Sequence, residues 1–159
     1  MILICYDGSP DAQAAITHAG KLMHGESATV LTVWEPFIDV MARAGAGMAY
    51  WDGVDLDEID AESERTARAR AEEGVELARA ASLNPQPRTR TRGATIAETI
   101  LSEADDVNAR TIVLGTRGLT GLKSLMLGSV SHAVLQHTDR PVIVVPSPEI
   151  AAKRAANRH

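Results

Sequence analysis

A chain of 159 residues is long enough for one domain with a sizeable buried core. Its composition, 45% apolar and 23% charged, is ordinary for a globular protein, and a net charge of −5 without a dense basic block argues against nucleic acid as a partner. No segment reaches the length of a membrane span, and a lone cysteine, Cys5, excludes an internal disulfide and a cysteine-based metal cluster. We expect a cytoplasmic protein without a membrane partner, in which Cys5 is a small core residue.

The chain begins with the pattern of a parallel sheet. Residues 1–6 are a continuous apolar run that ends in Asp7-Gly8-Ser9, which predicts a strand buried on both faces. Ser9 is a suitable cap for the helix that follows. Residues 28–34, rich in Val and Thr, predict a second strand. The crossover between the two strands is long enough for parallel pairing.

Residues 35–56 interrupt this alternation. The segment holds a proline, three glycines and several aromatic residues, including Tyr50 and Trp51, without a clear period. A loop of this length is typical of a lid, a binding loop or an interface arm, and a surface insertion without such a role stays equally open. We expect an insertion-like loop here.

The remaining chain returns to alternating helices and strands. Thr95 opens a capping box, and the charged and threonine residues before it are typical of an edge strand. The predicted elements are helix 57–82, strand 89–92, helix 95–107, strand 111–114, helix 129–137 and strand 141–145. This order predicts one α/β domain over residues 1–147, an open, doubly wound, Rossmann-like sheet of five parallel strands with helices on both faces. Residues 148–159 are expected to be a C-terminal tail.

The segment after the fourth strand has the composition of a phosphate loop. Gly115 and Gly118 leave the strand, and Gly128 and Ser129 open the next helix. Glycines let backbone N–H groups approach a ligand, and a helix start presents unsatisfied N–H groups to an anion. Ser129 and Ser131 add hydroxyl groups. The same residues also occur in ordinary turns, and the spacing is neither a Walker loop nor a dinucleotide fingerprint.

The gapped pattern Gly115-x2-Gly118-x9-Gly128-Ser129 resembles the nucleotide loop of the universal stress protein family (UspA-like), in its ATP-binding branch. The similarity extends over the whole chain, including Asp7-Gly8-Ser9, the helix with Glu98 and the closing run of residues 140–146. It implies an adenine nucleotide α-hydrolase-like fold. It also implies a stress sensor or regulator that binds ATP and forms a homodimer.

The resemblance assigns each candidate residue a role. Asp7 would contact the ribose or a magnesium ion near the phosphates, with Gly8 and Ser9 beside it, although a turn or capping role for Asp7 stays open. Val33 would read the adenine edge through its backbone, and Leu114 would pack near the nucleoside. The phosphate contacts, mostly through the backbone, would come from Gly115, Gly118, Gly128, Ser129 and Val130, next to Ser131. Arg117 either pairs with a phosphate or points to solvent.

No nucleophile–base pair is visible, so the sequence does not require catalysis. Slow ATP hydrolysis or autophosphorylation at Ser129 or Ser131 stays open, as do AMP, ADP or cyclic AMP in place of ATP. The competing hypotheses are an ATP-dependent enzyme of the related adenine nucleotide α-hydrolase type and a nucleotide-independent dimerisation module. The apolar strand of residues 142–145 predicts homodimer pairing through a sheet edge. A regulatory protein partner is expected without being identified.

Overall fold

A computed structural model describes residues 1–45, 55–119 and 127–157. Five parallel strands form one sheet in the order β3-β2-β1-β4-β5. The strands are β1 (Ile2–Cys5), β2 (Ser27–Trp34), β3 (Asn84–Thr91), β4 (Ile112–Gly115) and β5 (Val142–Val145). This order confirms the predicted open, doubly wound α/β architecture.

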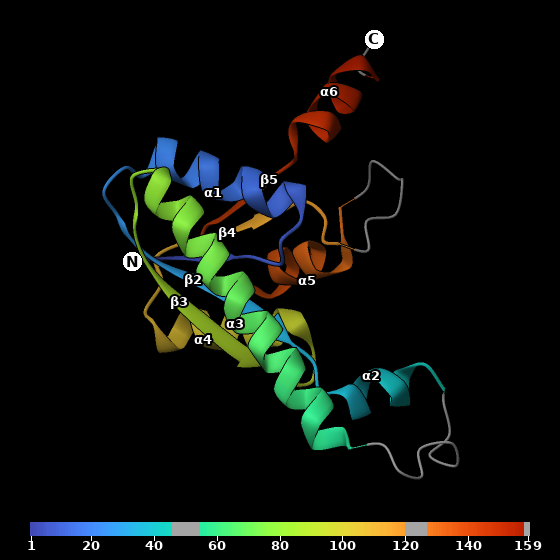
Figure 1. The fold of residues 1–159 in the computed structure, drawn as a ribbon. Helices are drawn as coiled ribbons and strands as arrows, with labels where there is room; N and C mark the ends of the chain where they lie inside the picture. The colour runs from blue at the N-terminus through green and yellow to red at the C-terminus, as the bar shows by residue number, and fades with distance from the viewer. Residues whose placement is uncertain (46–54, 120–126, 158–159) are drawn as a thin grey trace.

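Helices cover both faces of the sheet (Figure 1). One face carries α1 (Pro10–Leu22) and α3 (Leu56–Ala80), and the other carries α4 (Ile96–Asp106) and α5 (Ser129–His137). The residues of β1 alternate between the two layers, because successive side chains of a strand point to opposite faces. Ile2 and Ile4 belong to the core cluster of α1 and α3, whereas Leu3 belongs to the cluster of α4 and α5. The apolar run at the start of the chain is therefore buried on both sides.

The direction of winding reverses between β1 and β4. From β1 the chain proceeds outward to β2 and β3, and it then returns to the other side of β1 to form β4 and β5. The register pairs Leu3 with Ile112 and Ile4 with Val113, so the carboxyl ends of β1 and β4 lie side by side. In open parallel sheets, ligands bind at such a switch point.

Two helices lie outside the predicted elements. Within the expected insertion-like loop, α2 (Phe37–Arg43) forms a short helix, and residues 46–54, including Tyr50 and Trp51, lie outside the described part of the chain. In the expected C-terminal tail, α6 (Pro148–Ala156) forms a helix that buries Ile150. Figure 1 shows α6 projecting from the body of the domain. None of the helices in the described ranges is long and apolar enough to cross a membrane.

The third strand begins five residues earlier than the sequence predicted, at Asn84 instead of residue 89. The N–H group of Asn84 donates to the carbonyl of Glu26, and that of Arg92 donates to the carbonyl of Trp34. Pro85 lies within the strand, and a proline is tolerated there because β3 is an edge strand.

Candidate functional site

The carboxylate of Asp7 joins the loop after β1 to the loop after β4. Its Oδ1 accepts a hydrogen bond of 2.9 Å from the Ser9 N–H group, and its Oδ2 accepts one of 3.1 Å from the Leu119 N–H group. The Ser9 hydroxyl caps α1 by accepting from the Ala12 N–H group, and it also donates to the Arg117 carbonyl at 3.3 Å. Asp7 thus has a turn role, and its oxygens keep lone pairs for a further partner.

Two motif glycines lie where a side chain would not fit. A β-carbon at Gly118 would lie 2.6 Å from Oδ2 of Asp7, and one at Gly115 would lie 2.7 Å from the backbone carbonyl carbon of Asp11. Gly8 has a φ of +83°, a conformation that side chains disfavour. At Gly115 and Gly118, the end of β4 and the loop after it pack against Asp7 and the start of α1 with no side chain between them.

The backbone of Gly115 and Gly118 forms what we call the cradle. The start of α5 lies beside it and has no side-chain cap. Gly128 is its N-cap residue, and the Gly128 N–H group donates to the Thr116 carbonyl at 2.7 Å. Ser129 is exposed and Val130 half-buried in the first turn. An uncapped first turn carries orphan N–H groups and the positive end of the helix dipole, both of which favour an anion. The glycine cradle and this helix start fit a phosphate group.

The hydroxyl of Ser131 is engaged within the protein. It donates to the Gly115 carbonyl at 2.9 Å and to the Thr116 carbonyl at 3.2 Å, and the residue is only 3% exposed. Ser131 thereby fixes the end of β4 against α5. In this arrangement Ser129 is the more accessible of the two candidate hydroxyls.

Arg117 faces an acidic group that the sequence did not indicate. Its Nε lies 3.9 Å from Oδ2 of buried Asp11, whose Oδ2 also accepts a hydrogen bond from the Thr116 hydroxyl. The pKa of Glu149 in α6 lies below its ordinary value, chiefly because of the hydrogen bond from Lys153 and also because Arg117 is near. The Arg117 side chain therefore lies on the side of α1 and α6. No local sequence signal places Asp11 and Glu149 beside it.

The candidate nucleoside residues lie at the ends of their strands. Leu114 is 4% exposed within the core cluster of α4 and α5, and Val33 is half-buried against the same cluster. Val33 also lines a hollow of about 310 Å³ at the carboxyl end of β2, together with Trp34 and with Thr66 and Arg70 of α3. Arg70 in turn lies against Gly8, so it links this hollow to the loop after β1.

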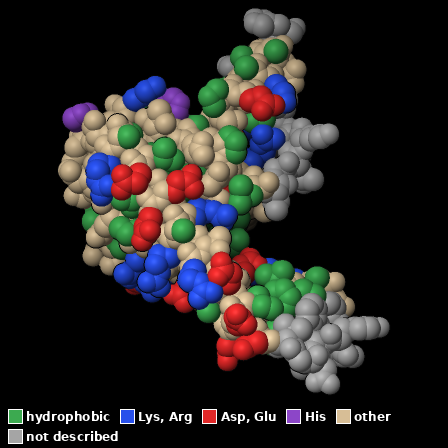
Figure 2. Space-filling model, in the orientation of Figure 1, with side chains coloured by type: hydrophobic (Ala, Val, Ile, Leu, Met, Phe, Trp, Pro, Cys, Tyr) green, Lys and Arg blue, Asp and Glu red, His purple; other side chains and the backbone are tan. Residues whose placement is uncertain are grey.

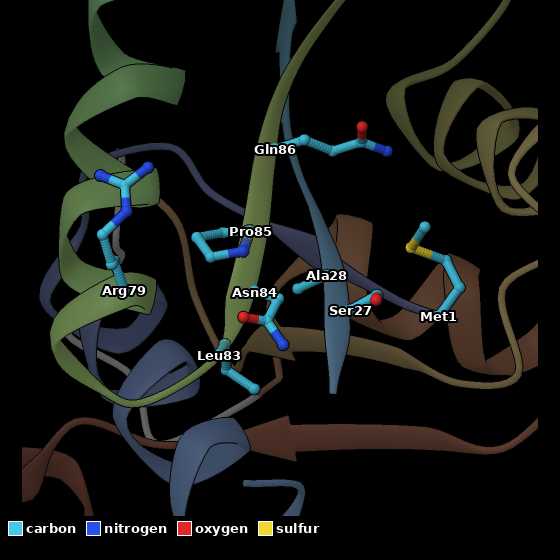
Figure 3. A pocket seen from close by; sticks show the side chains of 8 residues that line it. All are labelled: Met1, Ser27, Ala28, Arg79, Leu83, Asn84, Pro85 and Gln86. Atoms are coloured by element: carbon cyan, nitrogen blue, oxygen red, sulfur yellow. The ribbon is translucent and has the colours of Figure 1, made fainter. Parts of the chain in front are cut away.

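A larger hollow, of about 470 Å³, lies elsewhere (Figure 3). Its lining includes Ser27 and Asn84, the first residues of β2 and β3, so it is at the amino ends of these strands. Its basic residue, Arg79, pairs with Glu76 of the same helix. This hollow shares no residue with the predicted site.

Within the described ranges, no three His, Cys, Asp or Glu side chains are close enough together to hold a metal ion. A magnesium ion here would need phosphate oxygens and water for most of its ligands, which is its usual environment beside nucleotides. Asp7 is the candidate residue for contact with such an ion.

The fold and the site define a class of protein, a doubly wound α/β domain with a glycine-rich loop at its switch point. The model of the "Universal stress protein family" matches residues 1–146. This chain belongs to the universal stress protein family.

Two curated relatives carry the same family name. A universal stress protein of Thermus aquaticus is 33% identical over 146 residues, which are 91% of this chain and 96% of the relative. YxiE of Bacillus subtilis is 32% identical over 146 residues, covering 91% of this chain and 97% of the relative.

Solved structures have the same fold. The protein MJ0577 of Methanocaldococcus jannaschii superposes with a TM-score of 0.72 at 22% identity, covering 91% of this chain and 94% of that one. A universal stress protein from Archaeoglobus fulgidus, solved in complex with dAMP, has a TM-score of 0.62 at 21% identity and covers 91% and 95%. A further universal stress protein structure, solved in complex with cAMP, has a TM-score of 0.59 at 20% identity, covering 92% of this chain and 95% of that one. At these identities the likeness establishes the fold.

Proposed function

We propose that this protein is a cytoplasmic regulator that binds an adenine nucleotide, ATP with magnesium, at the carboxyl ends of β1 and β4. The observation that carries the proposal is the bare-backbone cradle. Gly118 lies against Asp7, and the uncapped start of α5 is tied to the end of β4 through Gly128 and Thr116. Such a cradle suits a phosphate chain. The complexes of two similar proteins with dAMP and cAMP support an adenine nucleotide as the ligand.

The proposed pose runs across three strand ends. The phosphates lie against Gly115, Gly118, Gly128, Ser129 and Val130. The ribose and a magnesium ion lie near Asp7, and the backbone of Val33 reads the adenine edge. The order β2-β1-β4 in the sheet agrees with this sequence of base, ribose and phosphates.

The proposed activity is binding rather than rapid catalysis. The Ser131 hydroxyl is directed to two backbone carbonyls, so it would have to break these bonds to accept a phosphoryl group. Nucleotide occupancy would instead alter the contacts of the protein with a regulatory partner.

The decisive experiment has two measurements. Purified protein is denatured and its small molecules are separated by ion exchange, and nucleotide-free protein is titrated with ATP, ADP, AMP and cyclic AMP by calorimetry. We expect a released adenine nucleotide and saturable binding. Protein that releases none and binds none of the four would refute the proposal. If cyclic AMP binds more tightly than ATP, cyclic AMP is the ligand and ATP is not.

We also propose a homodimer that pairs two copies of β5 at the sheet edge. The strand is wholly apolar and ends the sheet on one side. Its side chains are half-buried apart from Val145, and pairing with a second copy would satisfy its outward N–H groups.

A further inference from the structure

Arg70 lies at the boundary between the inner and outer faces of α3. Ala67, Ala71 and Gly74 belong to the buried stripe of this helix. Arg70 is three residues after Ala67 and four before Gly74, so it lies beside this stripe. A β-carbon at Gly8 would lie 3.2 Å from Nε of Arg70 and 3.5 Å from its Cδ. The side chain of Arg70, a half-buried residue, therefore lies over the loop after β1. It lies there at Gly8, the residue that follows Asp7.

The other arginines of α3 in ion pairs have partners within their own helix. Arg65 pairs with Glu62, Arg68 with Glu64 and Arg79 with Glu76. Figure 2 shows basic and acidic side chains intermixed on this side of the molecule, as such pairs require. These three arginines are more than half exposed, and exposed pairs of this kind contribute little.

Arg70 differs from them in its helical neighbours. Four residues before it is Thr66, four after it is Gly74, and three after it is Glu73. The Glu73 carboxylate accepts a hydrogen bond of 2.6 Å from the Tyr6 hydroxyl. Across residues 1–45, 55–119 and 127–157, no carboxylate lies within 4.0 Å of the Arg70 guanidinium. Arg70 thus brings a half-buried positive charge to the site.

The position of Arg70 specifies the part of a nucleotide that it would meet. On one side it lines the hollow with Val33 and Trp34, where the base is proposed to lie. On the other side it contacts Gly8, whose neighbour Asp7 is the proposed ribose residue. The cradle of Gly115 and Gly118 follows beyond Asp7. Arg70 thus lies beside the proposed ribose position, and the anionic group of a nucleotide closest to the ribose is the phosphate joined directly to it.

We propose that Arg70 binds this first phosphate and selects nucleotides over nucleosides. The inference rests on the proposed function and specifies one of its contacts. A guanidinium presents a planar fork of donors that matches a phosphate, and it stays charged at every physiological pH. AMP, ADP, ATP and cyclic AMP all carry a phosphate on the ribose, so Arg70 would serve each of them.

The test compares Arg70→Gln with a matched variant, Arg68→Gln, whose side chain lies on the same helix at 64% exposure. Both are titrated with AMP, ATP and adenosine by calorimetry, after circular dichroism has shown that they are folded. For Arg70→Gln we expect the affinities for AMP and ATP to fall about tenfold, the usual scale for a lost charged hydrogen bond, and the affinity for adenosine to stay within about twofold. Arg68→Gln should match the wild type.

Two results would overturn the inference while leaving the proposed function intact. One is unchanged AMP binding by Arg70→Gln, and the other is an equal loss for adenosine and AMP, which would assign Arg70 to the base, the ribose or the fold. If Arg70→Gln does not fold, Arg70→Lys takes its place. It keeps the charge without the fork, and we expect a loss of about threefold for AMP with adenosine unchanged. A wild-type protein that binds no adenine nucleotide would refute the proposed function, and this inference with it.

Discussion

Cys5 is the last residue of β1, and Tyr6 follows it directly before Asp7. Burial is the main cause that raises the pKa of the Cys5 thiol to about 12, and the charge of Asp7 adds to it. The pKa of the Tyr6 phenol is also raised to about 12, chiefly by burial and next by its hydrogen bond to Glu73. Both groups are uncharged at neutral pH, and Cys5, which is half-buried against the core cluster of α4 and α5, is not a reactive thiolate.

The raised pKa of Tyr6 makes the stability of the protein sensitive to alkali. The unfolded phenol loses its proton near pH 10, whereas the folded one keeps it until about pH 12. Its contribution is therefore fully present below pH 10 and is lost as the pH rises towards 12, by up to about 1.4 kcal/mol per pH unit. Tyr6→Phe removes this contribution, so urea unfolding at pH 9 and pH 11 should show a smaller alkaline loss in the variant. Parallel curves would contradict this assignment, because Cys5 titrates in both proteins.

Adding one β-carbon at Gly118 tests whether the cradle binds the nucleotide. A β-carbon there would lie 2.6 Å from Oδ2 of Asp7 and would displace the carboxylate from the Leu119 N–H group. We expect Gly118→Ala to weaken ATP binding by about tenfold, as a misplaced charged hydrogen-bonding group does. Gly93→Ala is the control, since its β-carbon would meet only the Thr99 hydroxyl, at 3.4 Å. Equal affinity of the two variants in calorimetry would show that the cradle does not bind the ligand.

At the scale of elements, α1 and the end of α3 pack together at a glycine. A β-carbon at Gly20 would lie 2.2 Å from the carbonyl oxygen of Ala81 and 2.6 Å from its Cβ. In a free helix, alanine is more favourable than glycine by about 1 kcal/mol. Overpacking a core, in contrast, costs roughly 1–3 kcal/mol. We expect Gly20→Ala to lower the free energy of unfolding by about 1–2 kcal/mol in urea titration, and a rise would show that the helices can separate at little cost.

The sequence predicted the elements whose patterns are local. A continuous apolar run identified β1, a segment rich in Val and Thr identified β2, and the glycine spacing identified the loop after β4. The short helix α2 was missed because it buries none of its seven residues, and Phe37, Val40 and Met41 are too short a pattern at helical spacing to indicate a helix. The start of β3 was missed because two prolines in residues 84–88 read as the end of the preceding helix.

The neighbours that sequence analysis missed lie far along the chain from the residues they contact. Arg117 lies beside Asp11 of α1 and near Glu149 of α6, and Arg70 of α3 lies over Gly8. In the same way, the sequence analysis interpreted the arginines of β3 as exposed residues of an edge strand. Arg88 and Arg90 instead pair with Glu103 of α4, whose side chain is fully buried. Such contacts depend on the packing of whole layers, which no short pattern encodes.

For the whole molecule, the two edges of the sheet determine how copies can meet. The Ile112 N–H group donates to the Pro141 carbonyl and the Thr116 N–H group donates to the Val145 carbonyl. Because the backbone of a strand alternates, Val142 and Val144 direct their own N–H groups away from β4. These are the donors that the proposed homodimer would use.

Val144→Pro tests that edge directly. It removes one outward donor while leaving the bonds to β4, and edge strands tolerate proline at such positions. We expect the dimer mass in light scattering to fall to that of a monomer with the circular dichroism spectrum preserved. Val144→Ala keeps the N–H group and should remain a dimer. A dimeric Val144→Pro would exclude β5 as the contact. A lysine at this position is less informative, since the Val144 side chain packs against the core.

The opposite edge, β3, carries Pro85 and Pro87. Asn84 and Arg92 direct their N–H groups toward β2, so residues 85 and 87 occupy the outward-facing positions, and proline has no N–H group to offer there. The first half of this edge cannot act as a template for a further strand. Two copies joined at β5 would expose only β3 edges, and the prolines would leave half of each edge without outward donors, which disfavours growth into a filament.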